Sequence, residues 1–161
     1  MIDESSSRDS TLTFMMGEFE ATFPTDRLYA KNHMWAQVAD EDPPRVRFGF
    51  TAYAVRLLQD VYFLDWLLDA PVALKDSQEI GSIESKKAES ALFAPGPGQL
   101  LQFNDALMED PSAINTDKYS AGWLFDMHID NPEFLSPEQY IKLLDDVWAK
   151  TQRTIKGQLN E

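Results

Sequence analysis

The chain contains no cysteine, and this absence excludes a disulfide framework, a thiolate nucleophile and a cysteine-based metal site. It has only two histidines, so a histidine-rich metal centre has little support and a Ser-His-Asp hydrolase would depend on His33 alone. The glycine-flanked serine elbow of such a hydrolase is missing, and so is a phosphate-binding glycine loop. We therefore expect no catalytic site and no metal site in this chain.

Positive charge is also scarce, since 14 basic residues face 27 acidic ones and the net charge is -13. This balance repels phosphate backbones and anionic lipids, so nucleic acid and membrane partners are not expected. It suits docking onto basic surfaces of partner proteins. The most apolar stretch, 62–69, is interrupted by Asp65 and Asp69, and the amino terminus lacks a cationic, apolar leader. The sequence predicts a soluble, cytoplasmic protein.

The first 13 residues are rich in serine, aspartate and glutamate and hold few apolar side chains. A segment of this composition cannot bury enough apolar surface to offset the entropy lost on folding. We therefore predict a disordered tail over residues 1–13. Because a chain of 161 residues suits one core rather than two, we predict a single domain over residues 14–161.

The remaining pattern predicts a mostly β, sandwich-like domain with helices at its edges. Strands are predicted where residues alternate or favour β structure, which is over residues 29–38, 45–50, 60–65, 99–103 and 123–129. Thr51 is placed to cap a short helix over residues 52–58. Ser136 and Gln139 form a capping box that begins a longer helix. We expect the apolar stripe of that helix to contact the core, and the stripe comprises Tyr140, Leu143, Leu144, Val147 and Trp148.

Residues 83–90 form a polar interruption between two apolar runs, 79–83 and 91–95. Apolar flanks around a short polar segment predict a β-hairpin whose turn faces water, with Lys86 and Lys87 at its tip. Such a lysine is either a solvated turn charge or the attachment point of a covalent group. The hairpin alone does not separate these two roles.

Several short segments occur in an order and spacing that resemble one known family, the glycine cleavage system H protein, between about Tyr29 and Tyr140. The segments are His33–Trp35, Gly49–Ala54, Glu84–Ala88, Pro95–Gly98, Asn104, Asn115 and Tyr119–Trp123. The resemblance implies the barrel-sandwich hybrid fold of lipoyl and biotinyl carriers, with short edge helices and a C-terminal helix. It also implies a non-catalytic carrier subunit on which partner enzymes act.

The family's modified lysine falls on Lys87, so the resemblance implies lipoate attached to Lys87 through an amide. Lys86 stands where the family often has valine. A biotinyl carrier would flank its lysine with methionines, and here the neighbours are Lys86 and Ala88. Glu84 also matches the family pattern, and we expect the lipoylation enzymes to recognise it.

The resemblance places three candidate residues, His33, Met34 and Ala91, at the cleft that holds the arm. Met34 and Ala91 stand where the family usually has glutamate and aspartate, and Gln59 stands where it usually has glycine. The two carboxylates would accept a cationic aminomethyl load. Because a hydrogen bond to a charged group is worth roughly 1.5–3 kcal/mol, we expect each loss to weaken the binding of that load about tenfold or more.

These departures favour a paralogous lipoyl carrier that acts in sulfur oxidation with a heterodisulfide-reductase-like complex. An alternative is an authentic glycine cleavage H protein, which carries the aminomethyl group and works with glycine decarboxylase, aminomethyltransferase and dihydrolipoamide dehydrogenase. A second alternative is an unmodified interaction module that keeps only the fold. Intact mass separates this last hypothesis from the other two.

Overall fold

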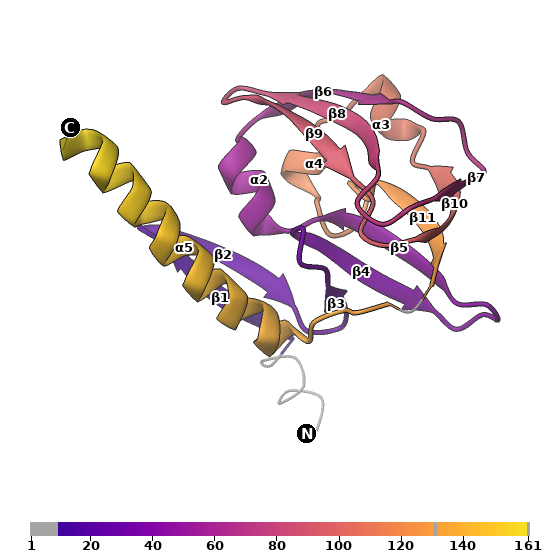
Figure 1. Cartoon of the computed structure of the whole chain (residues 1–161), viewed down its shortest axis with the longest axis horizontal. Coiled ribbons are helices and arrows are strands. Elements are labelled where there is room, and N and C mark those ends of the chain that lie inside the picture. The colour runs from indigo at the N-terminus through magenta and orange to yellow at the C-terminus, as the bar shows by residue number, and fades with distance from the viewer. Residues whose placement is uncertain (1–9, 131, 161) are drawn as a thin grey trace.

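The computed structural model describes residues 10–130 and 132–160, and for residues 151–160 it describes the backbone alone. A six-stranded sheet and a three-stranded sheet enclose a shared core, and a two-stranded hairpin lies outside them (Figure 1). Neighbouring strands are antiparallel throughout these sheets. The predicted mostly β, barrel-sandwich arrangement is therefore confirmed.

The six-stranded sheet has the order β3-β4-β5-β11-β10-β7. Its strands are β3 (Leu28–Tyr29), β4 (Met34–Ala39), β5 (Arg45–Phe50), β11 (Phe125–Ile129), β10 (Gly98–Phe103) and β7 (Val72–Leu74). The three-stranded sheet has the order β6-β8-β9, and its strands are β6 (Val61–Trp66), β8 (Glu79–Ser85) and β9 (Glu89–Phe93).

The main core fills the space between these two sheets. Alternation in β5 directs Val46 and Phe48 inward, because successive side chains of a strand point to opposite faces. Side chains from both sheets meet them there, among them Leu64, Ile80, Ile83, Leu92, Leu100, Phe125 and Met127. The lysine hairpin is thus anchored in the core through β8 and β9.

The strand predicted over residues 29–38 is interrupted, and β3 and β4 are its two parts. Between them His33 has a φ of 68°, which lies in the left-handed region that residues other than glycine rarely adopt. The backbone turns there, and the His33 amide donates to the Ala30 carbonyl at 3.1 Å. Sequence inspection missed the break because neither glycine nor proline marks it.

In the described part of the chain, four helices connect and cover the strands, namely α2 (Ala52–Leu58), α3 (Ala106–Glu109), α4 (Ala113–Thr116) and α5 (Pro137–Asn160). Thr51 caps α2 as predicted. At the start of α5, Gln139 and Ser136 exchange side-chain to backbone hydrogen bonds of 3.2 and 2.9 Å, which confirms the predicted capping box. No helix among residues 10–130 and 132–160 is both long and apolar enough to cross a bilayer.

A hairpin of β1 (Thr11–Met16) and β2 (Phe19–Pro24) corrects part of the predicted tail. Residues 11–13 belong to a strand, whereas residues 1–9 lie outside the described part of the chain. Phe14 and Met16 point inward from β1, but Met15 and Phe19 are exposed apolar residues. These outward apolar side chains hide the alternation that would otherwise predict the hairpin.

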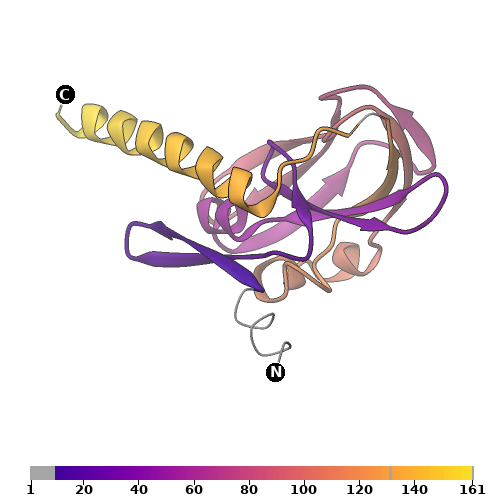
Figure 2. The ribbon, with the colours of Figure 1, turned by 90° about the horizontal axis from the view of Figure 1, so that it is seen from below.

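The hairpin and α5 extend from the same side of the barrel and enclose a second core (Figure 2). This core also includes residues of the barrel and α2, and its buried members include Phe14, Phe23, Tyr29, Trp35, Tyr53, Tyr140 and Leu144. Leu143, Val147 and Trp148 pack against it while partly buried. The predicted core role of the α5 stripe is therefore confirmed.

Candidate functional site: the lysine hairpin

Lys87 lies in the turn between β8 and β9, at the end of the three-stranded sheet nearest to α2 (Figure 1). Lys86, Lys87 and Ala88 are all exposed. In the part of the chain that the structure describes, the Lys87 ammonium forms no ion pair. An exposed amine without an internal partner fits the attachment of an acyl group.

Ser85 holds the turn in shape, and sequence inspection did not single it out. Its Oγ accepts hydrogen bonds from the amides of Lys87 at 3.3 Å and Ala88 at 3.2 Å, and it donates to the Ala88 carbonyl at 3.1 Å. The Ser85 amide donates to the same carbonyl at 2.9 Å. A buried serine immediately before the turn therefore fixes the backbone of Lys87.

A second contact ties the turn to the body of the protein. The Lys86 amide donates to the carbonyl of Asp60 at 3.0 Å, and Asp60 lies between α2 and β6. The side chain of Lys87 can therefore sweep through solvent while its root stays in place.

Glu84 lies below the turn on β8 and is half-buried. In the strand register it stands between Phe63 of β6 and Glu89 of β9. Like charges directly opposite each other destabilise a sheet, so this acidic pair costs stability in the isolated protein. A basic group on a partner enzyme would relieve the repulsion, which supports the hypothesis that Glu84 serves recognition.

The three residues assigned to an arm cleft lie in different environments. Met34 is 2% exposed and belongs to the main core. Ala91 is exposed on β9, where it pairs with Ser82. The His33 ring instead packs on Tyr53, with ring centroids 4.8 Å apart, in the region of the second core.

His33 forms one end of a chain of side-chain hydrogen bonds. Its Nδ1 lies 2.9 Å from the Tyr140 hydroxyl, which lies 2.9 Å from the Thr51 hydroxyl. Thr51 Oγ1 also accepts from the Ala54 amide at 3.3 Å. This chain joins the loop before β4, the start of α2 and the start of α5, so His33 has a structural role here.

Stability is expected to fall as the pH drops from 7 toward 5, because burial lowers the pKa of His33 below its usual 6.5. The unfolded chain then binds a proton that the folded chain does not, so the stability present above pH 6.5 is lost as the pH falls through the folded pKa. His33→Asn should flatten this slope, since asparagine tolerates a positive φ better than most residues do. Urea denaturation across this range measures it, and equal slopes in both proteins would refute the assignment.

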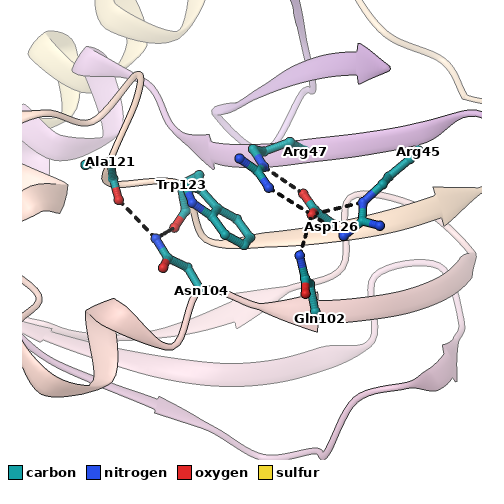
Figure 3. A network of polar contacts seen from close by, with 7 residues as sticks. All are labelled: Arg45, Arg47, Gln102, Asn104, Ala121, Trp123 and Asp126. Atoms are coloured by element: carbon teal, nitrogen blue, oxygen red, sulfur yellow. Dashed lines mark hydrogen bonds and ion pairs between the residues drawn. The ribbon is translucent and has the colours of Figure 1, made fainter. Parts of the chain in front are cut away.

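A buried carboxylate on the outer face of the larger sheet forms a network that sequence inspection also missed (Figure 3). Asp126 on β11 is 1% exposed and accepts hydrogen bonds from Arg45, Arg47 and Gln102 at 2.8–3.1 Å. Burial alone would raise the pKa of Asp126, but these hydrogen bonds outweigh it and hold the pKa below its usual value. The two arginines that alternate along β5 are the feature of the sequence that could have indicated this network. Because both lie on the same face of the strand, a nearby carboxylate is expected to balance their charge.

Side chains near this network also hold the loop that leads into β11. Arg47 lies over the Trp123 ring at 3.8 Å from the ring centroid. Asn104 donates from its side chain to the carbonyls of Ala121 at 3.0 Å and Trp123 at 2.8 Å (Figure 3). Two of the spaced residues on which the resemblance rests, Asn104 and Trp123, are thus explained by packing. Among the described residues, no three histidine or carboxylate side chains gather as a metal site would require.

The chain is similar to known proteins of one family. The family model for the glycine cleavage H-protein matches residues 27–147. The glycine cleavage system H protein of Methylacidiphilum infernorum is 37% identical over 127 residues, covering 76% of this chain and 96% of that protein. A crystal structure of a glycine cleavage system H protein from Mycobacterium marinum matches with a TM-score of 0.65 and 35% identity, over 73% of this chain and 95% of that one. The β1–β2 hairpin precedes the region that the family model matches.

Proposed function

Because the chain belongs to the glycine cleavage H-protein family, we propose that Lys87 is its lipoylated lysine and that it serves the glycine cleavage system. Members of this family are non-catalytic carriers with lipoate attached covalently to a lysine. The observation that carries the assignment to Lys87 is its exposed amine on a turn that Ser85 and Asp60 hold in place.

The sulfur-oxidation hypothesis, which the sequence favoured, receives no support from the relatives described above, all of which are glycine cleavage H proteins. The argument behind it also weakens in the structure. Ala91 is exposed, and an ion pair at an exposed position is worth only about 0.2–1 kcal/mol. The missing aspartate would thus change binding of a cationic load by less than the tenfold expected from the sequence.

The residues around Lys87 would have different roles in the carrier. A lipoyl amide supplies a cyclic disulfide that reduction opens and that holds transferred groups through sulfur. Ser85 and the Asp60 carbonyl hold the root of the arm, and Glu84 and Glu89 present negative charge beside it. We propose glycine decarboxylase, aminomethyltransferase and dihydrolipoamide dehydrogenase as partners, since electrostatic complementarity guides such transient docking.

Glycine–bicarbonate exchange catalysed by a glycine decarboxylase tests this function. The lipoylated protein is expected to support exchange well above the background of the enzyme alone, whereas the unlipoylated protein should not. Intact mass first establishes which form is present. Background exchange from a protein shown to carry lipoate on Lys87 would contradict the glycine cleavage assignment.

Ala91→Asp is expected to raise the exchange rate at limiting carrier concentration by up to about fivefold, the factor that 1 kcal/mol corresponds to. The exposed site accepts a carboxylate without strain in the core. Met34→Glu is a poorer test because position 34 is buried among apolar side chains, where an unpaired carboxylate is costly. Ala88→Asp, at an exposed position in the turn, controls for added negative charge. Equal rates for wild type and Ala91→Asp would show that position 91 does not contact the cargo.

Glu84→Gln is expected to slow lipoylation several-fold while leaving the melting temperature unchanged or slightly higher. The substitution removes the negative charge that the lipoylation enzyme is proposed to recognise. It also removes the repulsion between residue 84 and Glu89 on the opposite strand. Glu89→Gln is the matched control, because it relieves the same repulsion from the opposite strand. An unchanged lipoylation rate in Glu84→Gln would limit Glu84 to a structural role.

A further inference from the structure

A pocket of about 440 Å³ lies between α2, the β1–β2 hairpin and the loop after α4, and two of the 14 basic residues of the chain line it. These two are Arg56 near the end of α2 and Lys118 in the loop. Among the described residues, neither of them forms an ion pair. Asp60 also lines the pocket, so its walls carry two positive charges and one negative charge. In a chain with a net charge of -13, this local excess of positive charge favours the binding of an anion.

The amine of Lys118 is partly buried in the pocket wall. In the described part of the chain its Nζ forms one hydrogen bond, to the Asn115 carbonyl at 3.3 Å, which is slightly longer than the usual range of about 2.7–3.2 Å. Burial lowers the pKa of Lys118, and the charge of Asp117 offsets this effect only in part. The amine is therefore neutral more often than that of a fully exposed lysine, and a lysine with a lowered pKa is a better nucleophile.

Three hydrogen bonds fix the loop that carries Lys118. The Trp35 indole donates to the Lys118 carbonyl at 2.9 Å. The hydroxyl of Tyr119 accepts from the Ala52 amide at 2.9 Å and donates to the Thr22 carbonyl at 2.7 Å. The loop is thus joined to the start of α2 and to β2. Because α2 and the hairpin form the other walls of the pocket, the backbone of Lys118 keeps its place relative to them.

We propose that Lys118 is a second acylation site of this protein, with acyl phosphates as the donors. The proposal goes beyond the function proposed above and does not require lipoate on Lys87. In the reaction, the neutral amine of Lys118 attacks the carbonyl carbon of the acyl phosphate and forms a C–N bond. The C–O bond to phosphate breaks, and phosphate leaves with the electron pair and takes up the proton released from the nitrogen. The products are an amide on Lys118 and inorganic phosphate.

Arg56 is placed to hold the phosphate end of such a donor. A guanidinium can bind two phosphate oxygens through parallel hydrogen bonds. The guanidinium carbon of Arg56 lies 4.3 Å from the centroid of the Phe19 ring, and this stacking stabilises the position of the side chain. Phe19 and Val55 offer apolar surface to the acyl group. The volume lies within the range of about 300–1,000 Å³ that is usual for small-ligand pockets.

Peptide mapping by mass spectrometry, after incubation of the full-length protein with acetyl phosphate, tests this site. Lys31 and Lys75 are exposed lysines that do not line the pocket, and they serve as internal references. Acetylation at Lys118 is expected to be about threefold or more faster than at the references, since a pKa lower by one unit increases the neutral fraction of an amine about tenfold. Inorganic phosphate should slow acetylation at Lys118 alone. A rate at Lys118 equal to or below that of the references would overturn the proposal.

Arg56→Gln separates the binding of phosphate from the reactivity of the amine. It should slow acetylation of Lys118 by acetyl phosphate about threefold or more. Acetylation by the N-hydroxysuccinimide ester of acetic acid, which has no phosphate, should stay unchanged. Lys142→Gln is the matched control, because it removes a positive charge from an exposed position of α5 that does not line the pocket. Equal rates with acetyl phosphate in wild type and Arg56→Gln, or equal losses with both donors, would overturn the assignment of acyl phosphates. Each of these outcomes leaves the proposed function intact.

Discussion

Lys87→Arg is expected to abolish lipoylation and with it all carrier activity above background. Arginine keeps the positive charge and the length of the side chain, but its guanidinium is not acylated by enzymes that form an amide on a lysine amine. Lys87 is exposed and forms no ion pair with the described residues. The free energy of unfolding should therefore change by no more than about 0.5 kcal/mol, as is usual for surface substitutions.

Lys86→Arg is the matched control for this loss. Lys86 is the adjacent exposed lysine, and it contributes to the structure through its backbone amide, which donates to Asp60. The substitution leaves that hydrogen bond in place, so lipoylation and glycine–bicarbonate exchange should match the wild type. Loss of lipoylation in Lys86→Arg together with its retention in Lys87→Arg would show that lipoate is attached to Lys86 and not to Lys87.

Asp126→Asn should produce the largest loss of stability among the variants considered, about 3 kcal/mol at neutral pH. Removing one partner of a buried ion pair typically costs about 3–5 kcal/mol because it leaves the other charge unpaired. Here the lower end applies, since the side chains of Arg45 and Arg47 are 35% and 41% exposed and keep contact with water. Urea denaturation at pH 7 measures the loss.

The pH dependence of this loss provides its control. Asp126 keeps its pKa below the usual 3.8, so its contribution is present above that value and declines as the pH falls through the folded pKa. The difference between wild type and Asp126→Asn should shrink accordingly in acid. Asp65→Asn, at an exposed aspartate of β6, should change stability by less than about 0.5 kcal/mol. Equal stabilities of Asp126→Asn and Asp65→Asn would contradict a stabilising role for the network.

Several elements between residues 45 and 129 could be predicted because their signals are local. Strict alternation around Phe48 predicts β5, and Thr51 before an apolar helical pattern predicts α2. The hairpin of Lys87 follows from a polar interruption between apolar runs. A Cβ on Gly49 would lie 2.5 Å from the Trp35 ring. This close approach explains why position 49, one of the positions on which the family resemblance rests, is a glycine.

Other features depend on contacts between distant segments, and the sequence does not reveal those. The β1–β2 hairpin is stabilised by α5, which lies more than a hundred residues further along the chain, and by Tyr53 of α2. The exposed Met15 also hides the alternation of β1. Asp126 contacts the arginines of β5 because β11 pairs with β5 in the folded sheet. The sequence does not reveal this order of strands. The resemblance placed His33 at the arm cleft, whereas in the structure the His33 ring contacts Tyr140 of the second core.

The sequence predicts where the candidate site lies, but it does not predict the contacts that hold the turn in place. Lys87 and Glu84 follow from the hairpin and the resemblance, whereas Ser85 and Asp60 hold the turn through backbone geometry. Gln59 was noticed as a departure from glycine, but its positive φ becomes visible only in the three-dimensional structure.

Peptide mapping by mass spectrometry of the protein made in a lipoate-competent cell tests the central claim most directly. We predict a lipoyl amide on Lys87 and an unmodified Lys86, with loss of one positive charge that takes the net charge from -13 to -14. A protein without lipoate under these conditions, or with lipoate on Lys86, would contradict the account.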